Sequence, residues 1–200
     1  MIVVIDYGMG NLGSVAKALA YLGCPVTVSR DPDQVAAADR LILPGVGAMG
    51  YAIEQLERFG LDQAIRSFLR TGRPFLGICL GMQLMFERSE EGDARGLAIL
   101  PGVVRRFPGM PGLKIPHMGW NRLQDSQTDL LPEQESYYFV HSYFADPADP
   151  SITAAASVHG IRFSAAVQKD QILLTQFHPE KSGDAGLSLL KQWSSDRKAL

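Results

Sequence analysis

The sequence predicts an α/β fold with a doubly wound, mostly parallel sheet and added antiparallel strands in the C-terminal half. Two observations support this prediction. Between Met1 and Gln83, short apolar runs typical of buried strands alternate with longer segments typical of helices. From Gly96 onward, short β-like pieces follow one another between turns rich in proline and glycine. No internal repeat or low-complexity segment interrupts this pattern, so we expect one domain over residues 1–200.

The composition is that of an ordinary globular protein. With 200 residues, of which 46% are hydrophobic and 20% charged, the chain is large enough to bury a core and is not expected to be disordered. The formal net charge of −2 and the lack of a basic run give no indication of a nucleic-acid or membrane surface. Two cysteines are too few for a disulfide framework, and neither a leader nor a long apolar run is present. We therefore expect a cytoplasmic location.

The first strand is expected at Met1–Asp6, because apolar and mostly β-branched residues occupy consecutive positions, as in a strand buried on both faces. A glycine-containing turn leads into a helix that is expected to end near Leu22, where Gly23 follows. Val26–Ser29 is the second expected strand. This succession of strand, helix and strand is how a doubly wound sheet begins.

The turn after the first strand carries a motif that also occurs in nucleotide-binding proteins. Gly8, Gly10 and Gly13 match the fingerprint G-x-G-x-x-G, and Asp31 stands about where such sites have their ribose-binding acid. A nucleotide-binding α/β domain is therefore one alternative, and a simple tight turn is the other. NAD binding would leave the cysteine motif described below without an explanation.

A third strand, Arg40–Leu43, ends in the glycine-rich segment Pro44–Gly47. The backbone of such a segment turns tightly, or its N–H groups face a ligand. In enzymes with a nucleophile elbow, a loop in this position supplies an oxyanion-hole donor, here the N–H of Val46 or Gly47. A plain loop is the alternative. The next segment, Tyr51–Leu69, is expected to be largely helical with an interruption at its internal glycine.

The fourth strand, expected at Pro74–Ile78, meets a Gly-x-Cys-x-Gly turn centred on Cys79, and a helix is expected from Leu80 to Arg88. This is the layout of a nucleophile elbow with sulfur in place of serine oxygen. The flanking glycines let strand and helix approach closely, and N–H groups at the start of a helix favour a thiolate. Cys79 is the candidate nucleophile, with the Leu80 N–H as first oxyanion donor. A buried structural cysteine is the alternative.

The C-terminal half is expected to contribute short strands as antiparallel additions to the same domain. The expected strands are Val103–Phe107, Gly119–Leu123, Ser136–His141, Thr153–Val158, Ile161–Gln168 and Ile172–Phe177.

The last of these strands leads into His178-Pro179-Glu180. An imidazole at the carboxyl end of a strand could reach Cys79, taking its proton or holding the thiolate as an ion pair. Glu180, with the stiff Pro179 before it, could hydrogen-bond the other ring nitrogen and stabilise the imidazolium. Alone, the motif would indicate a surface turn. Together with the cysteine elbow, it predicts a Cys-His-Glu triad.

The other histidines do not indicate a metal site. His117, His141 and His159 lack metal-ligand spacing with one another and with the cysteines, so neither a metal nor a cofactor is expected. His141 belongs to the aromatic run Tyr137–Phe144, which is either a core strand or a wall of the substrate pocket.

The segments Gly77–Gln83 and Gln176–Glu180 together resemble the class I (triad) glutamine amidotransferases. Further segments resemble one branch of that family, the glutaminase subunits of imidazole glycerol phosphate synthases. They are Asp6–Leu12, Pro44–Gly47, Pro116–Asn121, Tyr138–Tyr143 and His178–Ser182. The resemblance runs from about residue 2 to residue 193, and it accounts for the glycines of the first turn as part of the family's own pattern.

The resemblance implies a flavodoxin-like fold and the hydrolysis of L-glutamine to glutamate and ammonia without a cofactor. It implies that the ammonia passes to a (β/α)8-barrel cyclase subunit, the partner in a heterodimer that forms imidazole glycerol phosphate and AICAR in histidine biosynthesis. By matching positions, Cys79 is implied as nucleophile, His178 as general base and then acid, and Glu180 as its orienting group.

Two further sets of residues are implied by matching positions. The residues implied to bind glutamine are Gln83, Glu91, His141, Ser142 and Tyr143. The residues implied to meet the cyclase are Asn11, Trp120, Tyr138 and Lys181.

The chain departs from the family pattern at His159-Gly160, where an aromatic residue usually precedes the glycine, and at Leu174, where glycine is usual. Neither departure falls in the triad, so they concern local loop shape. Besides the nucleotide-binding domain, the remaining alternative is another cysteine hydrolase with an elbow, such as a small peptidase or the glutaminase of pyridoxal phosphate synthesis. The position of Gln83 and the order His178-Pro179-Glu180 argue against the peptidase, and the Pro44–Gly47 loop argues against the vitamin enzyme.

Overall fold

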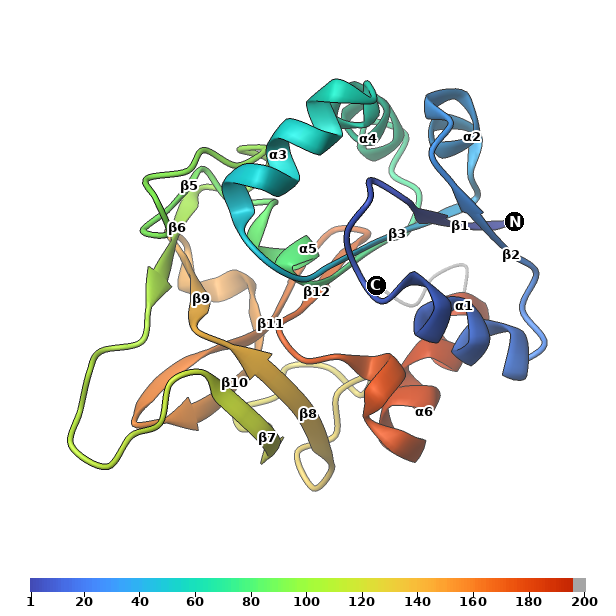
Figure 1. The fold of residues 1–200 in the computed structure, drawn as a ribbon. Helices are drawn as coiled ribbons and strands as arrows, with labels where there is room; N and C mark the ends of the chain where they lie inside the picture. Colours follow the sequence, from blue (N-terminus) through green and yellow to red (C-terminus); the bar gives the residue numbers. More distant parts are fainter. Residues whose placement is uncertain (196–200) are drawn as a thin grey trace.

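A seven-stranded sheet forms the centre of the computed structural model, which describes residues 1–195 (Figure 1). The strand order is β10-β11-β12-β4-β3-β1-β2. The parallel part consists of β1 (Ile2–Ile5), β2 (Val26–Ser29), β3 (Arg40–Gly45), β4 (Phe75–Cys79) and β12 (Ile172–Thr175). The sheet is extended by antiparallel pairing through β11 (Ile161–Lys169) and β10 (Thr153–His159). The doubly wound, mostly parallel sheet with antiparallel additions is therefore confirmed. One expectation was wrong: Ile172–Phe177 is not an antiparallel addition, because β12 runs parallel to β4 and ends at Thr175.

Helices cover both faces of this sheet (Figure 1). One face carries α2 (Pro32–Ala37), α3 (Met49–Arg58) and α4 (Leu61–Leu69), and the other carries α1 (Leu12–Tyr21) and α6 (Gly183–Ser195). Because successive strand residues point to opposite faces, β1 serves both layers: Val3 and Ile5 pack with the first group of helices, and Val4 with the second. This double burial explains the uninterrupted apolar runs of the sequence.

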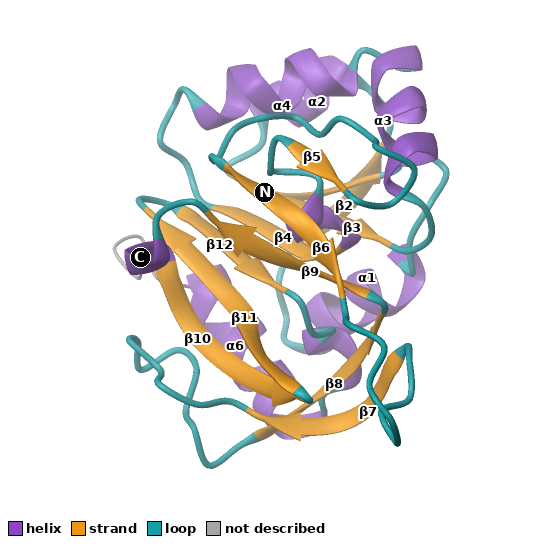
Figure 2. Ribbon diagram, turned by 90° about the vertical axis from the view of Figure 1, so that its left-hand side faces the viewer, coloured by secondary structure: helices purple, strands orange, loops and turns teal. Residues whose placement is uncertain are grey.

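Two smaller sheets lie beside the carboxyl ends of the central strands. One contains β5 (Arg88–Ser89), β6 (Gly102–Arg106) and β9 (Tyr143–Pro147), and the other is the ribbon of β7 (His117–Arg122) and β8 (Ser136–His141). Figure 2 shows the ribbon curving past the ends of β10 and β11. Short 3-10 turns, η1 (Pro150–Ile152) and η2 (Pro179–Lys181), complete the described chain.

The sequence did not predict every element. It gave no signal for β9 or for the two-residue β5, whose pairing partners come from elsewhere in the chain, and α6 was not among the expected helices. The interruption expected within Tyr51–Leu69 is present, because Gly60 adopts φ 66° between α3 and α4. Within residues 1–195, no helix is both long and apolar enough to cross a membrane. Residues 196–200 of the expected domain lie outside the described part.

Candidate active site

Cys79 ends β4 in a strained backbone conformation, with φ 55° and ψ −105°. Positive φ is uncommon for a residue with a side chain, and it is maintained only where surrounding structure enforces it. Here α5 (Leu80–Gln83) begins directly after Cys79, so the chain reverses sharply and carries the sulfur at the tip of the turn. This is the geometry of a nucleophile elbow.

The helix after Cys79 is shorter than the sequence predicts. The expectation was a helix from Leu80 to Arg88, but α5 ends at Gln83 and Arg88 lies in β5. The reason is a competing set of partners: the carbonyl of Leu84 accepts from Leu97, and that of Met85 from Ile99 and Leu100. These carbonyls are thus not available to continue the helix. A single helical turn offers Cys79 a few N–H groups and little helix dipole.

Strand register brings three distant segments to the elbow. Gly45 of β3 lies opposite Cys79 of β4, so the loop with Val46 and Gly47 begins beside the sulfur. On the other side, Thr175 of β12 lies opposite Ile78, so the chain from residue 176 onward leaves the sheet next to Cys79. Parallel strands end at the same edge, which explains why these motifs converge.

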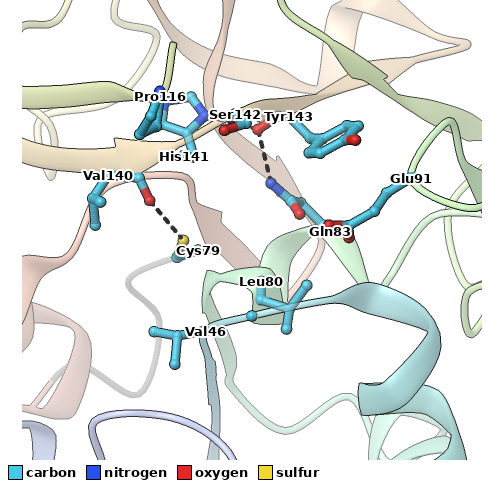
Figure 3. A pocket seen from close by; sticks show the side chains of 11 residues that line it. Val46, Cys79, Leu80, Gln83, Glu91, Pro116, Val140, His141, Ser142 and Tyr143 are labelled. Atoms are coloured by element: carbon cyan, nitrogen blue, oxygen red, sulfur yellow. Dashed lines mark hydrogen bonds between the residues drawn. The ribbon is translucent and has the colours of Figure 1, made fainter.

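A cavity of about 350 Å³ opens at this edge (Figure 3). Its lining residues are Val46, Gly47, Cys79, Leu80, Gln83, Glu91, Pro116, Val140, His141, Ser142 and Tyr143. All five residues expected to bind glutamine and all three expected oxyanion donors are therefore in one pocket. Pro116 and Val140 line it as well. Val140 belongs to the run Tyr137–Phe144, for which a pocket wall was one of two interpretations, whereas no site role was expected for Pro116.

His178 and Glu180 form a buried pair behind the cavity. His178 Nδ1 lies 2.9 Å from Glu180 Oε1, and both side chains are almost fully buried, with 2% and 1% of their area exposed. His178 Nε2 is buried and finds no hydrogen-bond partner among the described residues. Burial opposes a charge on the ring, but interactions with Cys79 and Glu180 outweigh it and raise the pKa of His178 to about 10. This raised pKa favours the imidazolium, the form of the ring that pairs with a thiolate.

The sulfur has two further polar neighbours. Gln176 Nε2 lies 3.7 Å from Cys79 Sγ and can donate to it, and the Val140 carbonyl oxygen lies 3.9 Å away. Tyr7 is also close: its hydroxyl lies where a Cβ of Gly45 would stand, and Gly45 is the register partner of Cys79. Burial, and then an interaction with Cys79, raise the pKa of this hydroxyl. Gln176 belongs to the expected motif, but no role was expected for it. Tyr7 was not expected at the site, because a buried tyrosine in a strand-to-helix turn is typical of a hydrophobic core.

The residues expected at a partner interface lie together only in part. Trp120 is 59% exposed, and its ring meets that of Tyr138 edge to face, with centroids 6.0 Å apart. Ser182, next to the exposed Lys181, accepts from the Tyr138 N–H and donates to the His178 carbonyl. Asn11 lies on another element, immediately before α1.

The two departures from the family pattern are accommodated by packing. His159 stacks on His117 with ring centroids 4.2 Å apart, so the imidazole fills the place of an aromatic ring. Leu174 lies against Gly77, where a Cβ would come within 2.7 Å of its Cδ2.

The glycine motif of the first turn lacks a feature of dinucleotide sites. In those sites the third glycine allows close helix–strand packing, but a Cβ at Gly13 would meet nothing within 4 Å. Asp31 instead accepts from the N–H of Asp33 and caps α2. Gly8 and Gly10 adopt φ values of 89° and 111°, as a tight turn requires.

Acidification is expected to destabilise the fold through His117 and His141. Burial lowers the pKa of His117 to about 4 and that of His141 to about 3, whereas an unfolded histidine titrates near 6.5. The unfolded chain therefore binds more protons below pH 6.5, so the stability is full above that pH and is lost as the pH falls toward 4. From pH 7 to pH 5 we expect a loss of roughly 2 kcal/mol for each ring. Urea unfolding at both values measures it, and an unchanged free energy would contradict this expectation.

The glutamine amidotransferase class-I family model matches residues 3–194. The chain is 48% identical over 196 residues to the imidazole glycerol phosphate synthase subunit HisH of Acaryochloris marina, covering 95% of this chain and 92% of that protein. It is 49% identical over 198 residues to HisH of Gloeobacter violaceus, covering 96% of this chain and 88% of that protein.

Solved structures share the fold at low sequence identity. A crystal structure of a glutamine amidotransferase superposes with a TM-score of 0.73 and 18% identity over 96% of this chain and 97% of that one. PurLQS from Thermotoga maritima gives a TM-score of 0.72 and 17% identity over 96% of both chains.

Proposed function

The chain belongs to the class I glutamine amidotransferase family, and from this premise we propose that Cys79, His178 and Glu180 form its catalytic triad. Like its HisH relatives, it is a glutamine amidotransferase subunit of imidazole glycerol phosphate synthase and hydrolyses glutamine to glutamate and ammonia. The observation that carries the triad is the strained Cys79 together with the buried His178–Glu180 pair, whose imidazole interacts with Cys79.

The reaction proceeds in two halves. The Cys79 thiolate attacks the carboxamide carbon of glutamine, and the His178 imidazolium gives its proton to the departing ammonia, which leaves a thioester. Neutral His178 then takes a proton from water, the water oxygen attacks the thioester, and glutamate leaves as the thiolate–imidazolium pair is restored. Glu180 holds Nδ1 throughout, so that Nε2 faces the reaction.

Backbone N–H groups around the elbow stabilise the negative oxygen that forms in each half. We assign this role to the N–H of Leu80 and to that of Val46 or Gly47, because all three residues line the cavity next to Cys79. One such donor is worth about 10²–10³ in kcat.

The pocket also has groups suited to the amino-acid end of glutamine. We propose that the Glu91 carboxylate binds the ammonium group and that Ser142 and Tyr143 help to hold the substrate. Gln83 donates its side-chain amide to the Tyr143 carbonyl and to Gln176 Oε1, so its oxygen remains to accept from the substrate. His141 forms the wall behind them.

Glu180→Gln tests the triad. The amide cannot stabilise an imidazolium as the carboxylate does, so we expect kcat to fall by about 10²–10⁴. The pKa of His178 is also expected to fall, because one of the two groups that raise it is removed. Glu57→Gln, at an exposed position of α3, is the matched control and should leave kcat unchanged. Equal activity of the two variants would contradict the assignment.

We further propose that the partner is a (β/α)8-barrel cyclase, bound in a heterodimer through Asn11, Trp120, Tyr138 and Lys181. The support is an apolar group of three exposed side chains: Val46, Met118 and Trp120 are 40%, 64% and 59% exposed. Val46 lines the pocket, Met118 is the register partner of the lining residue Val140, and Trp120 follows on the same strand. Such an apolar patch is typical of a protein interface. We also propose a cytoplasmic location, where histidine biosynthesis takes place, and one domain over residues 1–200.

The partner is expected to stimulate glutamine hydrolysis, because the exposed Val46 belongs both to the apolar group and to the proposed oxyanion loop. Ammonia release should be slow for the chain alone and rise by about 10² or more when the cyclase and its ribonucleotide ligand are added, which corresponds to the gain of one oxyanion donor. Equal turnover in both conditions would show that the loop is already in its active form.

A further inference from the structure

His117 and His141 face each other across the ribbon β7–β8, where their backbones are register partners. His117 Nδ1 lies 3.0 Å from His141 Nε2, and both side chains are buried. His141 lines the cavity, whereas His117 lies outside the lining. The reaction described above gives His117 no role.

Hydrogen bonds at the two ends of this pair determine which ring nitrogen of each histidine carries the proton. His141 Nδ1 lies 2.7 Å from the Tyr143 carbonyl oxygen, which can only accept, so Nδ1 carries the proton and Nε2 accepts. His117 Nδ1 must then donate to His141, and its Nε2 accepts from Asn121 Nδ2 at 3.2 Å. The Asn121 amide cannot be reversed, because Nδ2 also donates to the Val158 carbonyl at 2.9 Å. Burial lowers the pKa of both imidazoles, so both are neutral, as this arrangement requires.

The chain of hydrogen bonds continues to the nucleophile. The Tyr143 carbonyl accepts a second hydrogen bond, from Gln83 Nε2 at 2.9 Å. The same nitrogen donates to Gln176 Oε1 at 3.1 Å, and Gln176 Nε2 lies 3.7 Å from Cys79 Sγ. The orientation of the Gln83 amide is therefore set by two acceptors, one of which is held by His141.

We propose that His117 is a positioning residue for the glutamine pocket: by donating to His141, it keeps the Tyr143 carbonyl in place to orient Gln83. This inference rests on the proposed function and adds a residue that does not touch the substrate. The other face of β7 presents Met118 and Trp120 to solvent, so His117 also connects the pocket with the surface proposed for the partner.

Two substitutions distinguish the contribution of the hydrogen bond from that of ring packing. Both variants are assayed with the cyclase present. His117→Phe keeps a ring to stack on Phe139, whose centroid lies 4.9 Å away, but has no donor. His117→Asn loses the ring but keeps an amide N–H where Nδ1 stands. We expect His117→Phe to raise the KM for glutamine about tenfold with kcat changed less than threefold, and His117→Asn to stay within about threefold in both constants. If His117→Phe is no worse than His117→Asn, the proposal is overturned.

Side-chain 15N NMR tests the same chain without relying on activity or on a variant that folds. With four histidines in the sequence, long-range 1H–15N spectra can show which ring nitrogen of each is protonated. We expect Nδ1–H for both His117 and His141 in the wild-type protein at pH 7. A wild-type His141 protonated at Nε2 overturns the inference whatever the kinetics. A wild-type complex that does not hydrolyse glutamine would instead overturn the proposed function. The observed tautomers would then still show whether the hydrogen bonds between the two histidines are as described.

Discussion

Cys79→Ala is expected to abolish glutamine hydrolysis, lowering kcat/KM by at least about 10⁴-fold, because no other group in the pocket can form the thioester. Alanine keeps a Cβ, so the backbone at φ 55° should keep its conformation and the fold its stability. The variant should still bind the cyclase, and the complex should still run on added ammonium salt. Ammonia release from glutamine measures the loss.

Cys24→Ala is the matched control for this experiment. Cys24 is half-buried, and its sulfur lies 3.2 Å from Ser194 Oγ, remote from the pocket lining. Its removal should leave glutamine hydrolysis unchanged. An alanine variant at Cys79 that still splits glutamine would show that the elbow is a structural turn.

Gly81→Ala is expected to have the largest effect on stability. Gly81 has an ordinary backbone conformation, but a Cβ there would overlap the Leu43 carbonyl of β3, which is backbone in the centre of the sheet and cannot give way. Overpacking against buried backbone should cost more than about 4 kcal/mol, a large part of the total stability of a domain. Urea or thermal unfolding and soluble yield measure it.

Gly13→Ala provides the comparison, because Gly13 is an exposed glycine within α1 with open space around it. Alanine there should stabilise the protein by up to about 1 kcal/mol. Wild-type stability of Gly81→Ala would show that α5 packs less closely on β3 than described. A loss of stability in Gly13→Ala would show that Gly13 packs closely, as the third glycine of a dinucleotide-binding turn does.

The sequence predicted the inner strands of the central sheet well because they are buried on both faces. Runs such as Ile2–Ile5 and Phe75–Ile78 are apolar throughout, and this pattern depends on local sequence alone. The predicted length of the helix after Cys79 was wrong because it depends on contacts with a distant part of the chain. The residues after Gln83 have helical propensity, but their carbonyls bond to residues 97–100, a partner that propensity cannot reveal.

The site was predictable where a motif carries its own geometry. The turn around Cys79 and the sequence His178-Pro179-Glu180 each indicate a role, and strand order explains why they meet. The linkage of His117 to the pocket could not be predicted, since it depends on the register of β7 against β8 and on Asn121 fixing a tautomer. Those facts exist only in three dimensions.

The most direct test of the central claim, that Cys79 is the activated nucleophile, is covalent labelling by a glutamine-like chloroketone. The chain contains only two cysteines, Cys24 and Cys79, so intact mass followed by peptide mapping gives an unambiguous location. Our account predicts a single adduct, on Cys79, that excess glutamine suppresses. An adduct on Cys24, or none while the protein remains folded, would contradict it.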